Sequence, residues 1–204
     1  MTKTPETRTV EFIFDFVSPN GYLAWWPLKE IAARKGAAIT ITPVLLGGMH
    51  KLTGNAPPFV RDADVKGKNA YAQLEMQRFI ARHGLTKFRM NPAFPFRSVE
   101  LLRLLLAAID LGCGEAFAEA FLRAIWEQGL DPSDSAAIDA VIAAAGLPAA
   151  ALAEASQSAP VKDRLAANTQ NAVDRGTFGI PTFFVGDEMF FGKERLAQIE
   201  ELLG

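Results

Sequence analysis

The sequence contains few of the residues on which several classes of protein depend. Its 204 residues include one cysteine, Cys113, so the chain can form neither an internal disulfide nor a cysteine metal cluster, and dithiol redox chemistry within one chain is excluded. Its two histidines, His50 and His83, are far apart and belong to no metal-binding motif. We therefore expect no metal site.

An excess of charge of one sign and long apolar runs are also lacking. With 21 lysine and arginine residues against 23 aspartate and glutamate residues, the chain has no basic excess to hold a phosphate backbone, which argues against nucleic-acid binding. No apolar run in the sequence reaches the length that crosses a bilayer, and the polar residues 1–8 resemble neither a secretory signal nor an anchor. We expect a cytoplasmic protein with small-molecule ligands and no membrane association.

Half of the residues are hydrophobic, and their spacing predicts the first elements. In residues 10–16, valine or phenylalanine occupies every second position, which is typical of a strand with one apolar face. Ser18 and Pro19 suit the N-cap and first position of a helix, which we predict to end before Gly36. Alternation returns in residues 38–45, and the helix-length crossover between the two strands predicts a parallel βαβ unit.

The rest of the chain divides into a helical block and a hairpin. Residues 47–58 are rich in glycine and proline and predict an irregular loop, whereas residues 68–175 have helical periodicity and no convincing strand. Residues 182–185 and 188–191 predict a β-hairpin, followed by a helix at 193–203. The predicted fold class is α/β, with one mixed sheet (β-α-β, then β-β-α) formed by residues 1–45 and 176–204 and a large helical insertion at residues 46–175.

Ser18 is the first candidate for a chemical role. A Ser-Pro pair that opens a helix is ordinary capping. The alternative is that the hydroxyl, beside free backbone N–H groups and the positive end of the helix dipole, stabilises an anion such as a thiolate. Since the sequence shows no base near Ser18, we expect the hydroxyl to donate a hydrogen bond and not to attack a substrate.

The segment Gly179-Ile-Pro-Thr182 lies just before the predicted hairpin. A proline at the start of a strand is compatible with an edge strand or with a cis peptide at a tight turn. From the residues alone, the trans form is the commoner expectation.

The order and spacing of these motifs resemble the DsbA-like branch of the thioredoxin superfamily. In that branch the turn after the first strand is Cys-x-x-Cys, whereas residues 18–21 here are Ser-Pro-Asn-Gly. The Ser-Pro form, followed by Tyr-Leu-Ala, is similar to the kappa-class glutathione transferases and the closely similar 2-hydroxychromene-2-carboxylate isomerases. Further similar segments lie at residues 43–48, 53–58, 68–71, 94–95, 178–183 and 191–196. The resemblance implies a thioredoxin-like sheet domain.

The resemblance also implies glutathione as the cofactor. Ser18 would face the glutathione sulfur, and Ile180, before a cis Pro181, would offer backbone hydrogen bonds to the cysteinyl part. Asn55 and Lys68 match polar positions that line the site, the lysine suiting a carboxylate by its charge. The γ-glutamyl end would lie at the start of the last helix, at Phe191, Gly192, Lys193, Glu194 and Arg195.

Several residues depart from the pattern of the family. Glu194 stands where aspartate is usual, Asn20 begins an Asn-Gly pair where Tyr-Ser is frequent, and Arg97 stands where asparagine is frequent. Arg97 either pairs with a substrate carboxylate or is a solvated arginine. His50 either contacts the substrate from the loop or is an ordinary exposed histidine. Asn20, His50 and Arg97 are our candidate substrate-binding residues, and the identity of the substrate stays open.

The function that the resemblance implies is a glutathione-dependent isomerase of aromatic compound catabolism. The thiolate held by Ser18 would add reversibly to a small aromatic or hydrophobic substrate, and glutathione would be regenerated. One alternative is a kappa-type glutathione transferase or peroxidase, which consumes glutathione. The other is a non-catalytic thioredoxin-fold binding module. The resemblance further implies a homodimer.

Overall fold

The computed structural model describes residues 8–204. Our interpretation of residues 1–8 falls, except for Arg8, outside these residues. Within them, no helix is both long and apolar enough to span a membrane.

A four-stranded mixed sheet forms the centre of the fold, as predicted. Its strands are β1 (Thr9–Phe14), β2 (Ala38–Pro43), β3 (Thr182–Val185) and β4 (Glu188–Phe191), in the order β2-β1-β3-β4. Strand β1 is parallel to β2, with Val10 opposite Ile39, and antiparallel to β3, with Val10 also opposite Val185. Strands β3 and β4 form the predicted hairpin.

The predicted first strand is confirmed, but its side chains enter the core on both faces of the sheet and not on one apolar face alone. Phe12 stacks between Trp25 and Phe183, with ring centroids 5.8 and 5.3 Å away. On the opposite face, Ile13 packs in a second cluster that includes Met49. Truncating a fully buried phenylalanine such as Phe12 typically costs about 3–5 kcal/mol, so these contacts contribute strongly to the stability of the sheet.

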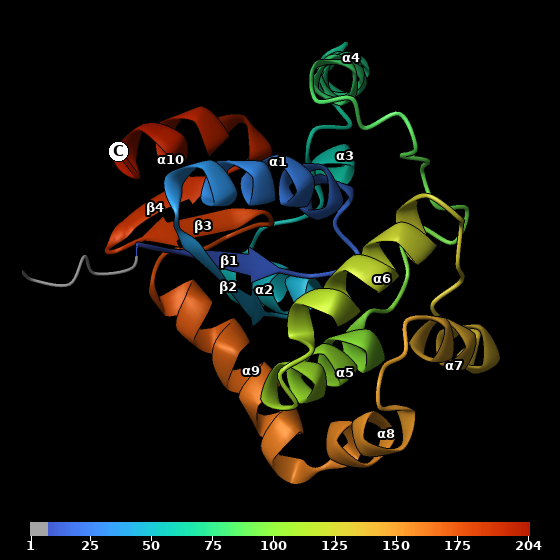
Figure 1. Cartoon of the computed structure of the whole chain (residues 1–204). Helices are drawn as coiled ribbons and strands as arrows, with labels where there is room; N and C mark the ends of the chain where they lie inside the picture. The colour runs from blue at the N-terminus through green and yellow to red at the C-terminus, as the bar shows by residue number, and fades with distance from the viewer. Residues whose placement is uncertain (1–7) are drawn as a thin grey trace, which may run out of the picture.

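Helices cover the two faces of the sheet (Figure 1). Helix α1 (Pro19–Lys35) lies beside α10 (Leu196–Leu202) on one face. Gly36 ends α1 in the left-handed region, with φ of 60°, which glycine adopts without a steric cost. On the opposite face lie α2 (Leu46–Thr53) and α9 (Ala159–Asp174). The predicted crossover and C-terminal helices are confirmed.

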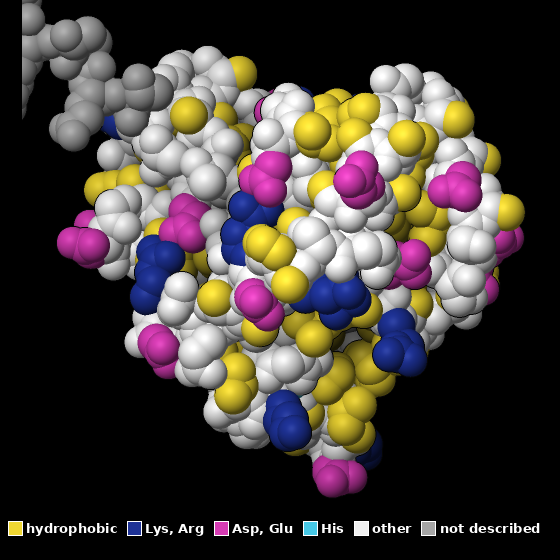
Figure 2. All heavy atoms as spheres, turned by 90° about the horizontal axis from the view of Figure 1, so that it is seen from below, with side chains coloured by type: hydrophobic (Ala, Val, Ile, Leu, Met, Phe, Trp, Pro, Cys, Tyr) yellow, Lys and Arg dark blue, Asp and Glu magenta, His cyan; other side chains and the backbone are white. Residues whose placement is uncertain are grey.

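The helical insertion joins the core of the sheet domain. It also contains α3 (Pro58–Arg61), α4 (Lys68–Arg82), α5 (Val99–Asp110), α6 (Gly114–Trp126), α7 (Ser135–Ala144) and α8 (Ala149–Gln157). One cluster of buried residues includes Phe12 from β1, Leu28 from α1, Leu105 from α5 and Phe121 from α6. On the face formed by the lower helices of Figure 1, acidic, basic and apolar side chains are interspersed (Figure 2).

The prediction of an irregular loop at residues 47–58 is wrong, because residues 46–53 form α2. Distant groups stabilise the start of this helix: Leu46 N–H donates to the Asp15 carboxylate at 2.8 Å, and Leu45 N–H donates to the Thr169 hydroxyl at 2.9 Å. Both bonds satisfy donors that a helix N-terminus leaves free. Local composition contains no sign of them.

Element boundaries differ from the predictions by a few residues. The first strand ends at Phe14 and the second at Pro43, two residues earlier than expected in each case, where the chain turns toward α1 and α2. The final helical segment begins as a 3-10 turn, η1 (Lys193–Arg195), before α10. Our division into a sheet domain and an inserted domain stays a prediction.

Candidate active site

Ser18 lies at the turn from β1 to α1 and is the N-cap of the helix, as predicted. Its hydroxyl oxygen accepts a hydrogen bond from Gly21 N–H at 3.2 Å and donates one to the carbonyl oxygen of Ile180, also at 3.2 Å. The residue is 4% exposed. Neither partner can take the hydroxyl proton as a base, so the contacts favour a hydrogen-bond donor over a nucleophile.

The segment Gly179-Ile-Pro-Thr182 lies next to the Ser18 turn in the fold. The Ile180–Pro181 peptide bond is cis, as the family resemblance implies and contrary to the commoner expectation from the residues alone. The Pro181 carbonyl accepts a hydrogen bond from Gly192 N–H at 2.9 Å. Residues 18, 180–181 and 192, far apart in the sequence, thus form one continuous region.

Asn55 connects α2 to the same region. Its side-chain amide donates to the carbonyl oxygen of Phe178 at 2.8 Å, two residues before Ile180. The rings of Phe178 and Phe191 are 4.5 Å apart between centroids, and Phe191 is 40% exposed. Asn55 and Phe191 therefore both contact Phe178, next to Ile180 and Pro181.

A charged network that the sequence analysis missed extends from Asn55 to Lys68. Asp62 forms ion pairs with Arg61 and Lys68, both at 2.9 Å, and Arg61 donates to the Asn55 side-chain oxygen at 3.5 Å. Hydrogen bonds from Arg61 and Lys68 hold the pKa of Asp62 well below its usual range. Arg61 and Asp62 belong to no distinguishing motif. Through them, the network joins the predicted site residues Asn55 and Lys68.

His50 lies in α2, not in a loop as expected, and is half-buried. Burial, and then the charge of Arg61, lower the pKa of His50. The imidazole is consequently neutral at pH 7 and can accept or donate a hydrogen bond.

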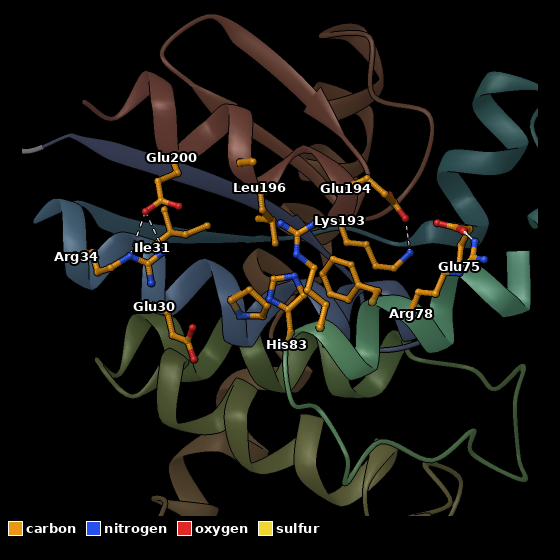
Figure 3. A pocket seen from close by; sticks show the side chains of 14 residues that line it. Glu30, Ile31, Arg34, Glu75, Arg78, His83, Lys193, Glu194, Leu196 and Glu200 are labelled. Atoms are coloured by element: carbon orange, nitrogen blue, oxygen red, sulfur yellow. Dashed lines mark hydrogen bonds and ion pairs between the residues drawn. The ribbon is translucent and has the colours of Figure 1, made fainter.

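Lys193 and Glu194 line a cavity of about 310 Å³ between α1, α4 and the start of α10 (Figure 3). They form an ion pair with each other, and Arg78 pairs with Glu75 beside them. Lys193 is 6% exposed, and its ammonium lies 5.3 Å from the centroid of the Phe79 ring. Arg195 is exposed and lies outside the lining of this cavity.

A cluster of aromatic rings lies beside the Ser18 turn. The indole N–H of Trp126 donates to the carbonyl oxygen of Phe16 at 3.1 Å, two residues before Ser18. Trp126 contacts the rings of Phe88, Phe94 and Phe96, and Phe94 contacts Phe59, which is 46% exposed. This cluster offers a partly exposed apolar surface next to the turn.

The remaining substrate candidates have no assigned contact at the site. The Asn20 side-chain oxygen is buried and has no hydrogen-bond partner among the described residues. Arg97 is exposed, and the structure brings it to none of the residues above. Among residues 8–204, no three His, Cys, Asp or Glu side chains are grouped as metal ligands.

The groups along this region match the functional groups of glutathione. The Ser18 hydroxyl can serve the sulfur, the backbone at Ile180 the cysteinyl part, and the paired charges of Lys193, Glu194 and Arg78 an amino acid end that carries both an ammonium and a carboxylate. A tripeptide of this chemistry fits the residues present.

Comparison with known proteins identifies the family and the relatives of the chain. Residues 9–204 match the family described as DSBA-like thioredoxin domain. The chain is 33% identical over 199 residues to a 2-hydroxychromene-2-carboxylate isomerase from Sphingobium xenophagum, covering 97% of this chain and 98% of the relative. It is 28% identical to human glutathione S-transferase kappa 1, covering 98% and 92%.

A solved structure agrees with these matches. The selenomethionine form of a 2-hydroxychromene-2-carboxylate isomerase superposes with a TM-score of 0.82 at 28% identity, covering 96% of this chain and 94% of that structure. The thioredoxin-like fold predicted from the sequence is confirmed.

Proposed function

Because the chain belongs to the DSBA-like thioredoxin family, and within it to the group of 2-hydroxychromene-2-carboxylate isomerases and kappa-class glutathione transferases, we propose that it is a glutathione-dependent isomerase. The observation that carries the proposal is the contact between the Ser18 hydroxyl and the Ile180 carbonyl at the N-terminus of α1. A serine, not a cysteine, occupies the reactive turn.

The Ser18 hydroxyl can exchange its hydrogen bond to the Ile180 carbonyl for one to a bound sulfur. A distance of 3.2 Å to Ile180 is long for a hydrogen bond between two oxygens, so the hydroxyl proton is held weakly. A thiolate in front of the helix gains a charge-assisted hydrogen bond from Ser18 and the favourable field of the helix N-terminus. Both effects lower the pKa of the thiol. When bound, glutathione supplies a thiolate nucleophile at neutral pH.

The rest of the tripeptide has a route along the site. Gly192 bonds to Pro181, and Lys193 and Glu194 follow it immediately. We propose that a tripeptide with its sulfur at Ser18 extends past Pro181 and Gly192 to Lys193 and Glu194, which line the cavity of Figure 3. There, Lys193 and Arg78 suit the γ-glutamyl carboxylate and Glu194 suits its ammonium. On the other side of the sulfur, Asn55 and Lys68 suit the remaining polar end.

The aromatic cluster around Trp126 supports an apolar second substrate. Phe59 and Phe94 offer ring faces beside the turn, and aromatic pairs prefer offset or edge contacts that an aromatic substrate can make. We propose a small aromatic compound held there, with Asn20, His50 and Arg97 as its polar contacts. We also propose a cytoplasmic homodimer.

The test is the fate of glutathione during conversion of 2-hydroxychromene-2-carboxylate. An isomerase converts many equivalents of substrate for each glutathione and leaves the free thiol concentration unchanged. Stoichiometric loss of thiol would instead support the kappa-type transferase or peroxidase. Absence of both turnover and a glutathione-dependent rise in melting temperature would support the non-catalytic binding module.

A further inference from the structure

Asp15 is a fully buried carboxylate three residues before Ser18, with an exposed fraction of 0%. It lies where β1 has ended and the chain turns toward α1. Burying a charge is costly unless hydrogen bonds compensate it. The partners of Asp15 therefore indicate what it stabilises.

Those partners come from three segments of the chain. One carboxylate oxygen accepts Val17 N–H at 3.1 Å, and the other accepts Leu46 N–H at 2.8 Å. The backbone carbonyl of Asp15 accepts Ser18 N–H at 3.1 Å. The buried side chain of Ser98, the N-cap residue of α5, also lies close enough to Asp15 to lower the pKa of the carboxyl.

Each segment leads directly to a proposed site residue. Val17 and the Ser18 amide fix the turn that aims the Ser18 hydroxyl. Leu46 is the first residue of α2, which carries His50 and ends just before Asn55. Ser98 follows Arg97, a candidate that the structure does not bring to the other site residues. The Asp15 side chain thus holds the Ser18 turn and the start of α2 in a common frame, with the start of α5 beside them.

We propose that Asp15 is the positioning residue of this site, fixing the Ser18 turn relative to α2 and to the start of α5. The inference rests on the proposed function and assigns a role to a residue that contacts neither glutathione nor substrate. The ionised carboxylate suits the role because it only accepts hydrogen bonds. An amide in its place would direct an NH₂ group at a backbone N–H.

The charge state agrees with this geometry. Burial raises the pKa of Asp15 to about 6, while Ser98 and the bonds from Leu46 and Val17 act in the opposite direction. At neutral pH the carboxyl is ionised and accepts both of these bonds. No step of the proposed reaction uses its proton.

The test compares Asp15→Asn with a matched control, Asn91→Asp. Asn91 is also buried, and its amide donates to the Ile125 and Leu130 carbonyls at 2.8 Å. Each substitution is isosteric and places a mismatched group against the same buried partners. Asn91 adjoins the aromatic cluster through Phe94 and Ile125, whereas Asp15 contacts the Ser18 turn, so the pKa of the bound thiol is the readout that compares the two variants. The readouts are the pKa of the bound glutathione thiol from thiolate absorbance, the kinetic constants and the melting temperature.

We expect only Asp15→Asn to change the bound thiol, whatever each substitution does to the melting temperature. In that variant the bound thiol should have a higher pKa, and kcat/KM should fall by about 10- to 100-fold, the usual cost of a small misplacement of reacting groups. A thiol pKa equal to that of Asn91→Asp would overturn the inference. Failure of the proposed function looks different, because the wild type itself would then not bind glutathione.

A second pair of variants keeps the inference testable if Asp15→Asn does not fold. Leu46→Pro removes only the N–H that Asp15 accepts, at a first helical position where proline is tolerated, and Leu45 already has extended backbone, with φ of −90° and ψ of 103°. Leu46→Ala controls for the lost side chain. We expect Leu46→Pro to raise KM for glutathione several-fold above Leu46→Ala. Equal KM values would overturn the link to α2.

Discussion

At the scale of single residues, Ser18 uses one oxygen for two tasks. It accepts the Gly21 N–H that would otherwise be free at the helix start, and it donates to Ile180. Accepting and donating use different parts of the hydroxyl, so capping persists when the proton turns to a ligand. The sequence presented capping and anion binding as alternatives, whereas the geometry makes them compatible.

Replacing Ser18 by alanine removes both tasks together, and a control that loses only a helix cap separates their effects. The loss of a hydrogen bond to a charged group, about 1.5–3 kcal/mol, should raise the pKa of the bound glutathione thiol by roughly one to two units. Titration of thiolate absorbance with bound glutathione measures this shift.

The control for this change is Ser158→Ala. Ser158 caps α9 through Val161 N–H, so each variant should lose about 1 kcal/mol of stability from its cap. Only Ser18→Ala should change the thiol. If the thiol pKa stays the same in both variants, Ser18 has no role beyond capping.

Asp15 should also give the protein a pH-dependent stability. Its pKa in the folded chain is about 6, against an ordinary value of 3.8, so between these values the folded state binds more protons than the unfolded state. Stability from this group is thus present at low pH and lost as pH rises through 6. Relative to Asp15→Asn, the wild type should lose about 3 kcal/mol between pH 3.5 and 7.

Urea unfolding at several pH values checks this expectation. The difference in unfolding free energy between wild type and Asp15→Asn is the informative quantity, since the other groups titrate in both. A difference independent of pH would show that the folded-state pKa of Asp15 is ordinary.

At the scale of elements, the site depends on α2 and the segment after it, which the sequence analysis predicted least well. Glycine and proline in residues 47–58 indicated a loop, but Asp15 and Thr169 supply hydrogen bonds to the start of α2 from distant positions. Arg61 and Asp62 were not predicted as site residues for a similar reason. Their importance comes from contact with Asn55 and Lys68, which no local pattern shows.

Lys68 provides a test of this network. Lys68→Met should raise KM for glutathione by about tenfold and leave kcat nearly unchanged, because it removes a charge-assisted contact to a non-reacting end of the ligand. Lys66→Met is the control, since Lys66 is exposed on the same segment and has no proposed contact. Equal KM values in the two variants would remove Lys68 from the site.

At the scale of the whole molecule, the sheet and its flanking helices other than α2 followed from the sequence, because alternation and capping are local signals. The meeting of Ser18 with Ile180 did not follow from them. It depends on the antiparallel pairing of β1 with β3, which sets Ile13 opposite Thr182. The family resemblance predicted that Ser18 and Ile180 lie close together, whereas the residues alone did not.

Glutathione should stabilise the whole molecule if it binds across these elements. At 100 times its dissociation constant, it should raise the free energy of unfolding by about 2.7 kcal/mol. Thermal melts with increasing glutathione measure the effect, and ophthalmic acid, which lacks the thiol, is the matched ligand. A smaller shift with that analogue would assign part of the binding energy to the sulfur.

The pairing of Ser18 with Ile180 across 162 residues also sets an order for biosynthesis. At about 5–20 residues per second, the serine is synthesised roughly 8–30 seconds before its partner. During that interval the βαβ unit exists with one side of β1 unpaired, and an unpaired strand edge invites association with other chains. Helices of the insertion emerge next and can shield that edge. Strands β3 and β4 then close the sheet and complete the site at the same time.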